Sequence, residues 1–178
     1  MRAVIRVLPL ALLPLLAVAP PALGQGSALR GHDSNAPVDV AADRIEVQDR
    51  ADRAIFSGNV EARQGSLRLT APRVTVAYAS GGGIDIKRIE ASGGVTLRTP
   101  SETATSRFAI YDLDRRLVTM IGAVRLVQGA NHVQGGRLVL DLDTGRAVMD
   151  GGGAGAAGTQ SSGGRVTGRF TVPRRQGN

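Results

Sequence analysis

The chain repeats one stretch of sequence about three and a half times, and this repeat constrains its fold more than any other feature. Residues 56–76 read FSGNVEARQGSLRLTAPRVTV and residues 120–140 read MIGAVRLVQGANHVQGGRLVL, with glycine, valine and arginine in matching places. A third copy, one residue shorter, covers 91–111, and a partial copy covers 41–47. Repeats with a period near 30 residues are typical of stacked supersecondary units. The sequence therefore predicts one structural unit that is stacked several times.

Apolar and polar residues alternate within the copies, and this period of two is the pattern of half-buried β-strands. The strand-like segments are separated by turns rich in Gly, Asp and Ser, and we expect about ten or eleven strands and no helix. Gly58, Gly93 and Gly122 each precede a valine by two residues. Glycine inside a strand marks a bend or a close backbone approach. The sequence thus predicts an all-β domain over 38–150 whose hairpins bend alike around one apolar interior.

Both ends of the chain differ in composition from this domain. Residues 1–24 begin with two arginines, continue with an apolar run of 13 residues and end in Ala-Leu-Gly. This is the layout of a secretory signal peptide cleaved after Gly24, because a membrane span takes roughly 20 apolar residues. Residues 25–37 are polar and predict a flexible lead-in. Residues 151–178 are mostly Gly, Ala, Ser and Arg, and they predict a disordered tail.

The charge of the chain lies mainly at its two ends. The chain has 22 Lys and Arg against 15 Asp and Glu, a formal net charge of +7, but residues 25–150 hold 16 basic and 15 acidic residues. A nucleic-acid binder would gather basic groups on one face of its folded part, so this balance gives that class little support. The chain has no cysteine, which excludes disulfides and a lipid-anchoring cysteine.

The sequence contains no recognisable catalytic or metal-binding pattern. His32 and His132 are far apart and have no partners at metal-ligand spacing. Ser57 lies in FSGN, which is not the nucleophile elbow of a hydrolase. The glycine-rich runs 81–83 and 151–153 lack the Lys-Ser/Thr ending of a phosphate-binding loop. We therefore expect that the protein is no enzyme and that it holds no metal or cofactor.

Short motifs in the repeats resemble a known family. The first three are VDVAADRIEV at 38–47, FSGNV at 56–60 and LTAPRVTV at 69–76. In this order they resemble the LptA/OstA-like domain, and GGVTL at 93–97 and IGAVRL at 121–126 fit the same repeat. The resemblance covers most of the β domain. It implies an open β-jelly roll, a bent trough of repeated antiparallel hairpins with an apolar inside and strand edges exposed at both ends.

Members of this family carry lipopolysaccharide through the periplasm of Gram-negative bacteria, and the resemblance implies the same function here. An acyl chain of about 12 carbons in water costs on the order of 10 kcal/mol, so a glycolipid needs an apolar shield. The interior suits flexible chains because aromatic residues make up only 3% of the sequence. The family assembles end to end into a bridge between the two membranes, and exposed strand edges can extend a neighbour's sheet. The implied partners are lipopolysaccharide, copies of this chain and related jelly-roll components of the membrane complexes, with no membrane span after signal cleavage.

Two sets of residues are expected to contact the lipid. The first set is apolar and is assigned to the interior face of the strands: Val38, Val40, Ile45, Val47, Phe56, Val60, Leu67, Leu69, Val74, Val76, Val95, Leu97, Phe108, Ile110, Met120, Val124, Leu126, Leu138 and Leu140. The second set is the repeated arginines, whose guanidinium groups can bind phosphate bidentately: Arg44, Arg73, Arg107 and Arg137. Without the resemblance, the first set is interpreted as a closed core and the second as solvated strand residues.

Two other functions fit the sequence. One is a membrane-anchored LptC-like component of the same pathway, which shares the fold but keeps its N-terminal helix. The short apolar run at 7–19, interrupted by prolines, argues against this anchor. The other is a lipid-free structural β-repeat protein with a closed core, which would stay monomeric and bind no acyl probe. The basic tail either contacts anionic lipid or stays solvated.

Overall fold

The structure is a computed structural model that describes residues 32–81, 83–151 and 164–171. The predicted signal peptide and the first part of the predicted lead-in lie outside the described residues. The described residues form ten strands and one 3₁₀ turn, which confirms the all-β prediction. In chain order they are β1 (Val38–Ala41), β2 (Arg44–Gln48), η1 (Asp49–Ala51), β3 (Arg53–Gln64), β4 (Leu67–Ser80), β5 (Ile84–Arg98), β6 (Glu102–Asp112), β7 (Leu117–Gln128), β8 (Asn131–Asp141), β9 (Arg146–Asp150) and β10 (Thr167–Arg169).

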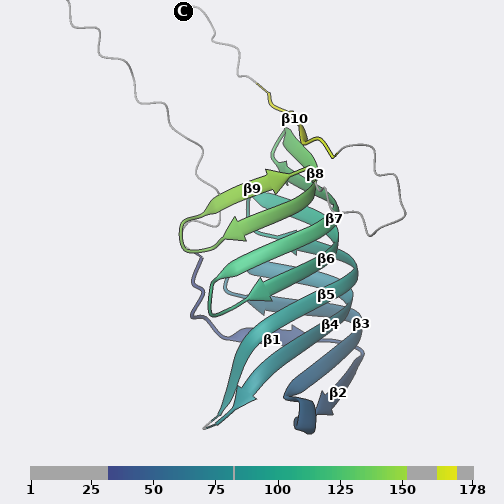
Figure 1. The fold of residues 1–178 in the computed structure, drawn as a ribbon, viewed down its shortest axis with the longest axis vertical. Coiled ribbons are helices and arrows are strands. Elements are labelled where there is room, and N and C mark those ends of the chain that lie inside the picture. The colour runs from purple at the N-terminus through teal and green to yellow at the C-terminus, as the bar shows by residue number, and fades with distance from the viewer. Residues whose placement is uncertain (1–31, 82, 152–163, 172–178) are drawn as a thin grey trace, which may run out of the picture.

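All ten strands belong to one antiparallel sheet that is not closed into a barrel. Its order is β1-β3-β4-β5-β6-β7-β8-β10, with β2 also paired to β3 and β9 also paired to β8. From β3 to β8, neighbours in the chain are therefore neighbours in the sheet, and Figure 1 shows the hairpins stacked along the long axis, as the repeat predicts. One free edge of the sheet consists of β1 and β2, and the other consists of β9 and β10.

Each long strand bends near its middle at a register shift. In β3, β5 and β7 two consecutive residues with positive φ occupy the shift, and these pairs contain the glycines that the repeat singled out: Gly58–Asn59, Gly93–Gly94 and Gly122–Ala123. At Gly58 an added Cβ would lie 2.4 Å from the Asp43 carboxylate oxygen, so both the φ of 76° and the space require glycine. The predicted bends are confirmed.

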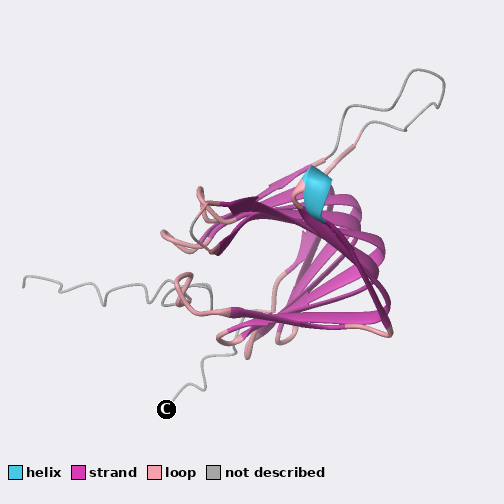
Figure 2. Ribbon diagram, turned by 90° about the horizontal axis from the view of Figure 1, so that it is seen from below, coloured by secondary structure: helices cyan, strands magenta, loops and turns pink. Residues whose placement is uncertain are grey.

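The bends fold the sheet into two facing layers that are joined along one side and open along the other (Figure 2). Layer A contains residues 38–41, 60–71, 95–106, 124–135 and 167–169, and layer B contains residues 44–57, 73–80, 84–92, 108–121 and 137–150. The hairpin turns of each layer form a margin at the open side. We call these margin A and margin B.

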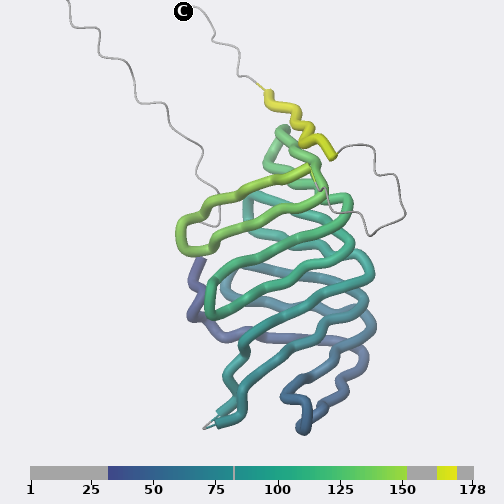
Figure 3. Tube along the Cα trace, in the orientation of Figure 1, coloured from purple at the N-terminus to yellow at the C-terminus, as the bar shows by residue number. Residues whose placement is uncertain are grey.

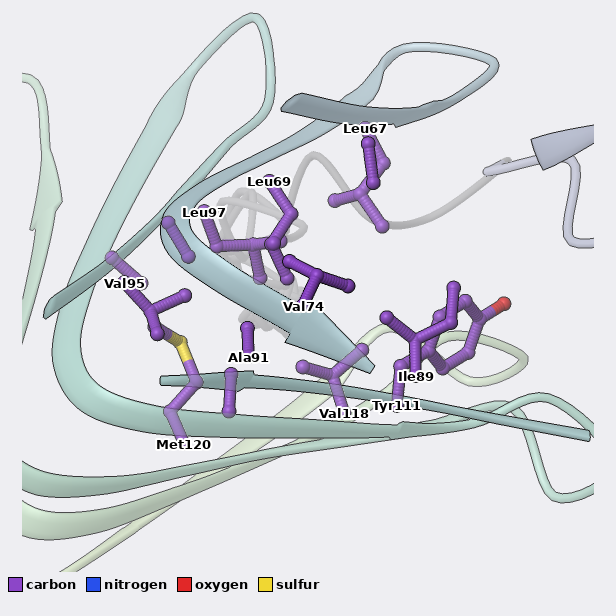
Figure 4. Packing of buried hydrophobic residues seen from close by; sticks show 14 of the residues in the cluster. Leu67, Leu69, Val74, Ile89, Ala91, Val95, Leu97, Tyr111, Val118 and Met120 are labelled. Carbon is purple, nitrogen blue, oxygen red and sulfur yellow. The ribbon is translucent and has the colours of Figure 1, made fainter. Parts of the chain in front are cut away.

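The inner faces of both layers share one apolar core. Val74 and Met120 of layer B are 0% exposed, and Val60 and Val95 of layer A are 1% exposed. Figure 4 shows inward side chains of both layers directed into the same space. This packing removes the apolar face of each strand from water, which is the main favourable contribution to folding. Among the described residues no helix has the length and apolar character that crossing a membrane would require.

Part of the predicted disordered tail belongs to the sheet. β10 pairs with residues 132–134 of β8, and the Thr171 amide donates a hydrogen bond of 2.8 Å to the Asn131 side-chain oxygen. The tube in Figure 3 shows this segment against the end of the stack. Composition predicts disorder here because the tail has few large apolar groups, but main-chain pairing to a neighbouring strand does not depend on side chains. Residues 152–163 and 172–178 lie outside the described residues.

Candidate binding interior

Most of the apolar residues predicted to line the interior point into it. They are buried or packed against the core: Val38, Val40, Phe56, Val60, Leu67, Leu69, Val74, Val76, Val95, Leu97, Met120, Val124, Leu126, Leu138 and Leu140. They come from β1, β3, β4, β5, β7 and β8, so the interior runs the length of the stack. Their predicted contact with lipid stays a prediction.

Two predicted interior residues point inward but are exposed. Ile45 lies opposite Phe56 and Val47 lies opposite Ala54, and directly opposed residues of antiparallel strands share a face. Ile45 is nevertheless 55% exposed and Val47 is 60% exposed. Both belong to β2 at the free edge, where no further strand covers them.

The prediction that Phe108 and Ile110 face the interior is wrong. Both lie on the outer face of β6, and Phe108 is 51% exposed. A register shift between Thr105 and Phe108 reverses the alternation, so Ala109 and Tyr111 point inward instead. A shift by one residue moves every later side chain to the other face. In the sequence, the apolar Phe108 and Ile110 looked like the inner set.

Several interior residues were not predicted. The apolar ones are Ala62, Ala71, Ile89, Ala91, Ala104, Ala109, Tyr111, Val118 and Leu142, and the buried polar ones are Gln64 and Ser106. Gln64 is in phase with Val60 and Ala62, so the alternation itself could have assigned it to the inside. Its polar side chain concealed this position.

Gln64 joins the two layers through a hydrogen bond with Tyr111. The Tyr111 hydroxyl donates to Gln64 Oε1 at 2.9 Å, and Gln64 Nε2 donates to the carbonyls of Ser34 and Ala36 at 2.9 and 3.0 Å. The His32 ring nitrogen Nε2 lies 3.2 Å from the same Gln64 Oε1. Burial raises the pKa of the Tyr111 hydroxyl, so this group is a hydrogen-bond donor at neutral pH.

Residues 32–36 cross the open side of the trough, and we call this segment the strap. At margin A it is held by Gln64, as described above. At margin B the Arg116 guanidinium donates to Asn35 Oδ1 at 3.2 Å and to Asp143 Oδ1 at 2.8 Å. The hydrogen bond to Asp143 raises the pKa of Arg116, which therefore keeps its charge. The strap, part of the predicted flexible lead-in, thus ties the two margins together.

The interior is filled by side chains. A cavity between the two layers has a volume of about 30 Å³, and its walls include Leu67 and Leu69 of layer A and Ile89 and Tyr111 of layer B. That volume holds about one water molecule. An acyl chain can therefore occupy the interior only if the layers move apart and the inward side chains change position.

The four repeated arginines lie outside the interior. Arg44, Arg73 and Arg137 stand on the outer face in one cross-strand row at the bend, and the Arg107 side chain lies beside Gly122. No ion pair of these arginines is found among the described residues. Their contact with lipid phosphate stays a prediction, and a phosphate would have to approach them from outside the trough.

The part of the chain that the structure describes contains no cluster of three His, Asp or Glu residues that could hold a metal ion. His32 lies in the strap and His132 lies at the start of β8, in layer A. The chemistry of the site is therefore that of an apolar interior with one polar bridge between its layers. Such a site can shield apolar groups from water.

Comparison with known proteins agrees with this architecture. A protein of Rhizobium meliloti (strain 1021) described as uncharacterized is 34% identical over 144 residues, which cover 75% of this chain and 77% of that protein. The lipopolysaccharide export system protein LptH of Pseudomonas aeruginosa is 27% identical over 146 residues, which cover 79% of this chain and 82% of LptH.

The fold has a counterpart among solved structures. The crystal structure of LptH, the LptA homologous periplasmic component of the lipopolysaccharide transport device of Pseudomonas aeruginosa, matches with a TM-score of 0.67 at 22% identity. The match covers 79% of this chain and 99% of LptH. Residues 39–146 match the family described as LptA/(LptD N-terminal domain) LPS transport protein. The chain therefore belongs to this family of lipopolysaccharide transport proteins, whose members are not enzymes.

Proposed function

We propose that this protein is a periplasmic carrier that holds the acyl chains of lipopolysaccharide between its two layers. The observation that carries the proposal is the continuous apolar interior of a sheet that is not closed, bridged on its open side by the strap. Family membership supports lipopolysaccharide as the cargo. The predicted signal peptide supports export to the periplasm.

Lipid binding in this proposal separates the two layers. The strap leaves the open side, and the hydrogen bond between Tyr111 and Gln64 breaks as the margins part. Each such hydrogen bond contributes about 0.5–1.5 kcal/mol. Burying one acyl chain of about 12 carbons gains on the order of 10 kcal/mol, which exceeds the loss of a few hydrogen bonds. The sugar head then stays in water along the open side.

The two free edges of the sheet complete the proposed function. An unpaired edge can accept a strand of another chain through main-chain hydrogen bonds. Copies of this protein, or of related jelly-roll components, would in this way continue the stack and join the inner to the outer membrane. Long exposed edges otherwise favour aggregation, so a dedicated partner for each edge is advantageous.

A lipid-free structural protein is the second candidate, and the filled interior is the observation that favours it. The two candidates differ in whether acyl chains ever reach the inward side chains. In the carrier they do when lipid is present. In the scaffold the core stays as it is in the structure.

Photocrosslinking from two phenylalanines separates these candidates. Phe56 is half-buried on the inner face and Phe108 is exposed on the outer face. Each is replaced in turn by benzoylphenylalanine in protein lacking residues 1–24, and the protein is irradiated with lipopolysaccharide and examined by mass spectrometry. We expect an adduct from position 56 and none from position 108. Equal adducts, or none from position 56 in a folded protein, would contradict the carrier.

A further inference from the structure

We propose that the polar site beneath the strap recognises the carbonyl groups that link acyl chains to a sugar, and that the strap occupies this site as an internal stand-in for them. The inference rests on the proposed carrier function and deepens it, because it names the part of the lipid that the interior binds through hydrogen bonds. It gives Gln64 and Tyr111 a role in binding besides joining the two layers.

The site lies where the apolar interior meets the open side. Gln64 is the last residue of β3 in layer A and is 4% exposed, and Tyr111 lies near the end of β6 in layer B and is 5% exposed. Both line the cavity of about 30 Å³, together with apolar residues such as Leu67 and Leu69. A lipid with its chains in the interior and its head in water along the open side has the groups that join chains and head at this level.

The strap presents carbonyl oxygens to this site and satisfies its own amide hydrogens. The backbone amides of residues 34–36 donate to oxygen atoms within the strap at 3.1, 3.0 and 3.2 Å. The carbonyls of Ser34 and Ala36 instead accept from Gln64 Nε2 at 2.9 and 3.0 Å. A carbonyl oxygen can only accept a hydrogen bond, so the NH₂ group of Gln64 must face the strap.

These contacts match the chemistry of an acylated sugar. An acyl chain is joined to a sugar through an ester or an amide, and either linkage carries a carbonyl oxygen like that of the strap. Gln64 has two N–H donors, and the Tyr111 hydroxyl, at 2.9 Å from Gln64 Oε1, holds the side-chain amide in this orientation. Two linkage carbonyls can therefore replace those of Ser34 and Ala36. A plain alkyl chain would leave the buried donors without acceptors, which is unfavourable, so the site selects against it.

The strap is an incomplete occupant of this site. Nδ1 of His32 is buried and has no hydrogen-bond partner among the described residues, and such an atom opposes the strapped state. At margin B the strap is held by an exposed hydrogen bond of 3.2 Å between Arg116 and Asn35. A lipid whose carbonyls satisfy Gln64 thus replaces the strap without loss of the hydrogen bonds that matter most, those of the buried amide.

Two matched probes test the recognition of the carbonyl. N-Lauroylglucosamine has an amide carbonyl between chain and sugar, and lauryl glucoside has a chain of the same length without a carbonyl. Each is titrated by calorimetry, below its micelle-forming concentration, into protein that starts at Gln25 and into protein that starts at Pro37 and lacks the strap. We expect removal of the strap to strengthen binding of N-lauroylglucosamine at least about tenfold and binding of lauryl glucoside by several-fold less. Equal gains for the two probes overturn the proposal.

Substitution of Gln64 tests which side chain makes the distinction. Gln64→Leu keeps a side chain of similar size but donates no hydrogen bond, so in the protein without the strap it should abolish the preference for N-lauroylglucosamine. Gln134, which is exposed in layer A, provides the matched control, and Gln134→Leu should keep the preference. A preference that survives Gln64→Leu in a protein with an unchanged circular dichroism spectrum overturns the assignment of this residue.

A third variant tests the strap in the chain that starts at Gln25. Asn35→Ala removes the contact with Arg116 and leaves Gln64 and the main chain of the strap in place. It should strengthen binding of N-lauroylglucosamine about twofold. Unchanged binding overturns the role of the strap as a competitor. If neither probe binds any variant, the inference fails, and lipopolysaccharide crosslinking from position 56 then decides separately whether the carrier fails with it.

Discussion

The middle of the sheet and its first edge carry the same inward apolar pattern, but only the middle buries it. Val74 in β4 and Ile45 in β2 lie in one cross-strand row and point to the same side, with Phe56 between them. Val74 is 0% exposed and Ile45 is 55% exposed. Val74 has a strand on each side and layer A in front of it, whereas Ile45 has a strand on one side only. Alternation therefore sets the direction of a side chain, and its neighbours set its burial.

This difference separates a stable region, the middle of the sheet, from a region whose apolar face is left uncovered, the first edge. The middle is a packed core whose residues should tolerate little change. The edge is a surface that resembles a core with one side removed, and its residues should matter for binding more than for folding. Mutations at matched positions can break or sharpen this contrast.

The largest effect is expected from a buried charge. Val74→Asp should destabilise the fold by more than about 4 kcal/mol, because an unpaired carboxylate in the apolar core has no compensating partner. Ile45→Asp, in the same row, should change the free energy of unfolding by less than about 1 kcal/mol because water reaches the site. Urea denaturation followed by circular dichroism measures both. Similar losses for the two variants would abolish the contrast between middle and edge.

Truncation of a core side chain should give the next largest effect. Met120 is 0% exposed, and Met120→Ala should cost about 2–5 kcal/mol through lost burial and the cavity that remains. Val47, which is 60% exposed, serves as the control, and Val47→Ala should cost less than about 1 kcal/mol. Thermal unfolding of the two variants gives the comparison. A small loss for Met120→Ala would indicate that the interior readily collapses around a cavity.

A smaller effect is expected from the polar bridge between the layers. Tyr111→Phe removes the hydrogen bond to Gln64 and should cost about 0.5–1.5 kcal/mol. The pKa of Tyr111 is raised above its unfolded value of about 10, so its contribution is complete below that pH and is lost as the pH rises through the folded pKa. Stability measured from pH 8 to 11 should therefore fall less in Tyr111→Phe than in the parent. Ser80→Ala, which removes an exposed hydrogen bond to Asp52, should cost less than about 0.5 kcal/mol.

The smallest effect is expected at a turn of margin B. The backbone amides of Thr144 and Asp143 donate to Asp141 at 3.0 Å and hold the pKa of this carboxyl below its usual value. A lowered pKa contributes stability above the unfolded value of about 3.9, and this contribution is lost as the pH falls through the folded pKa. Asp141→Asn should therefore reduce the loss of unfolding free energy at acid pH, measured by urea denaturation at a series of pH values. Thr144→Val keeps both backbone donors and should preserve most of this loss of unfolding free energy at acid pH.

The repeat made the architecture predictable from the sequence. Its period indicated stacked hairpins, its alternation indicated strands with one apolar face, and Gly58, Gly93 and Gly122 marked the bends. These are local properties: a strand alternates with period two wherever it lies, and a backbone with positive φ favours glycine in any context. The motifs carried the family resemblance, which the match over residues 39–146 confirms.

The composition of the interior was only partly predictable. Phe108 and Ile110 were assigned to the wrong face because a bulge has no fixed sequence signature, and β6 has no glycine at its bend. Gln64 and Tyr111 were missed because these two residues are 47 positions apart in the chain and meet only across the two layers. Apolar pattern alone does not identify a buried polar pair.

The sequence by itself determined the strands, their bends, their antiparallel stacking and an apolar inner face, because each of these depends on residues close together in the chain. Only the tertiary structure decided that the interior is filled, that the strap closes part of the open side and that residues 167–169 return to complete the last edge. These features depend on contacts between segments far apart in sequence. A repeat fixes how neighbouring units stack, and it leaves undetermined what happens where the stack begins and ends.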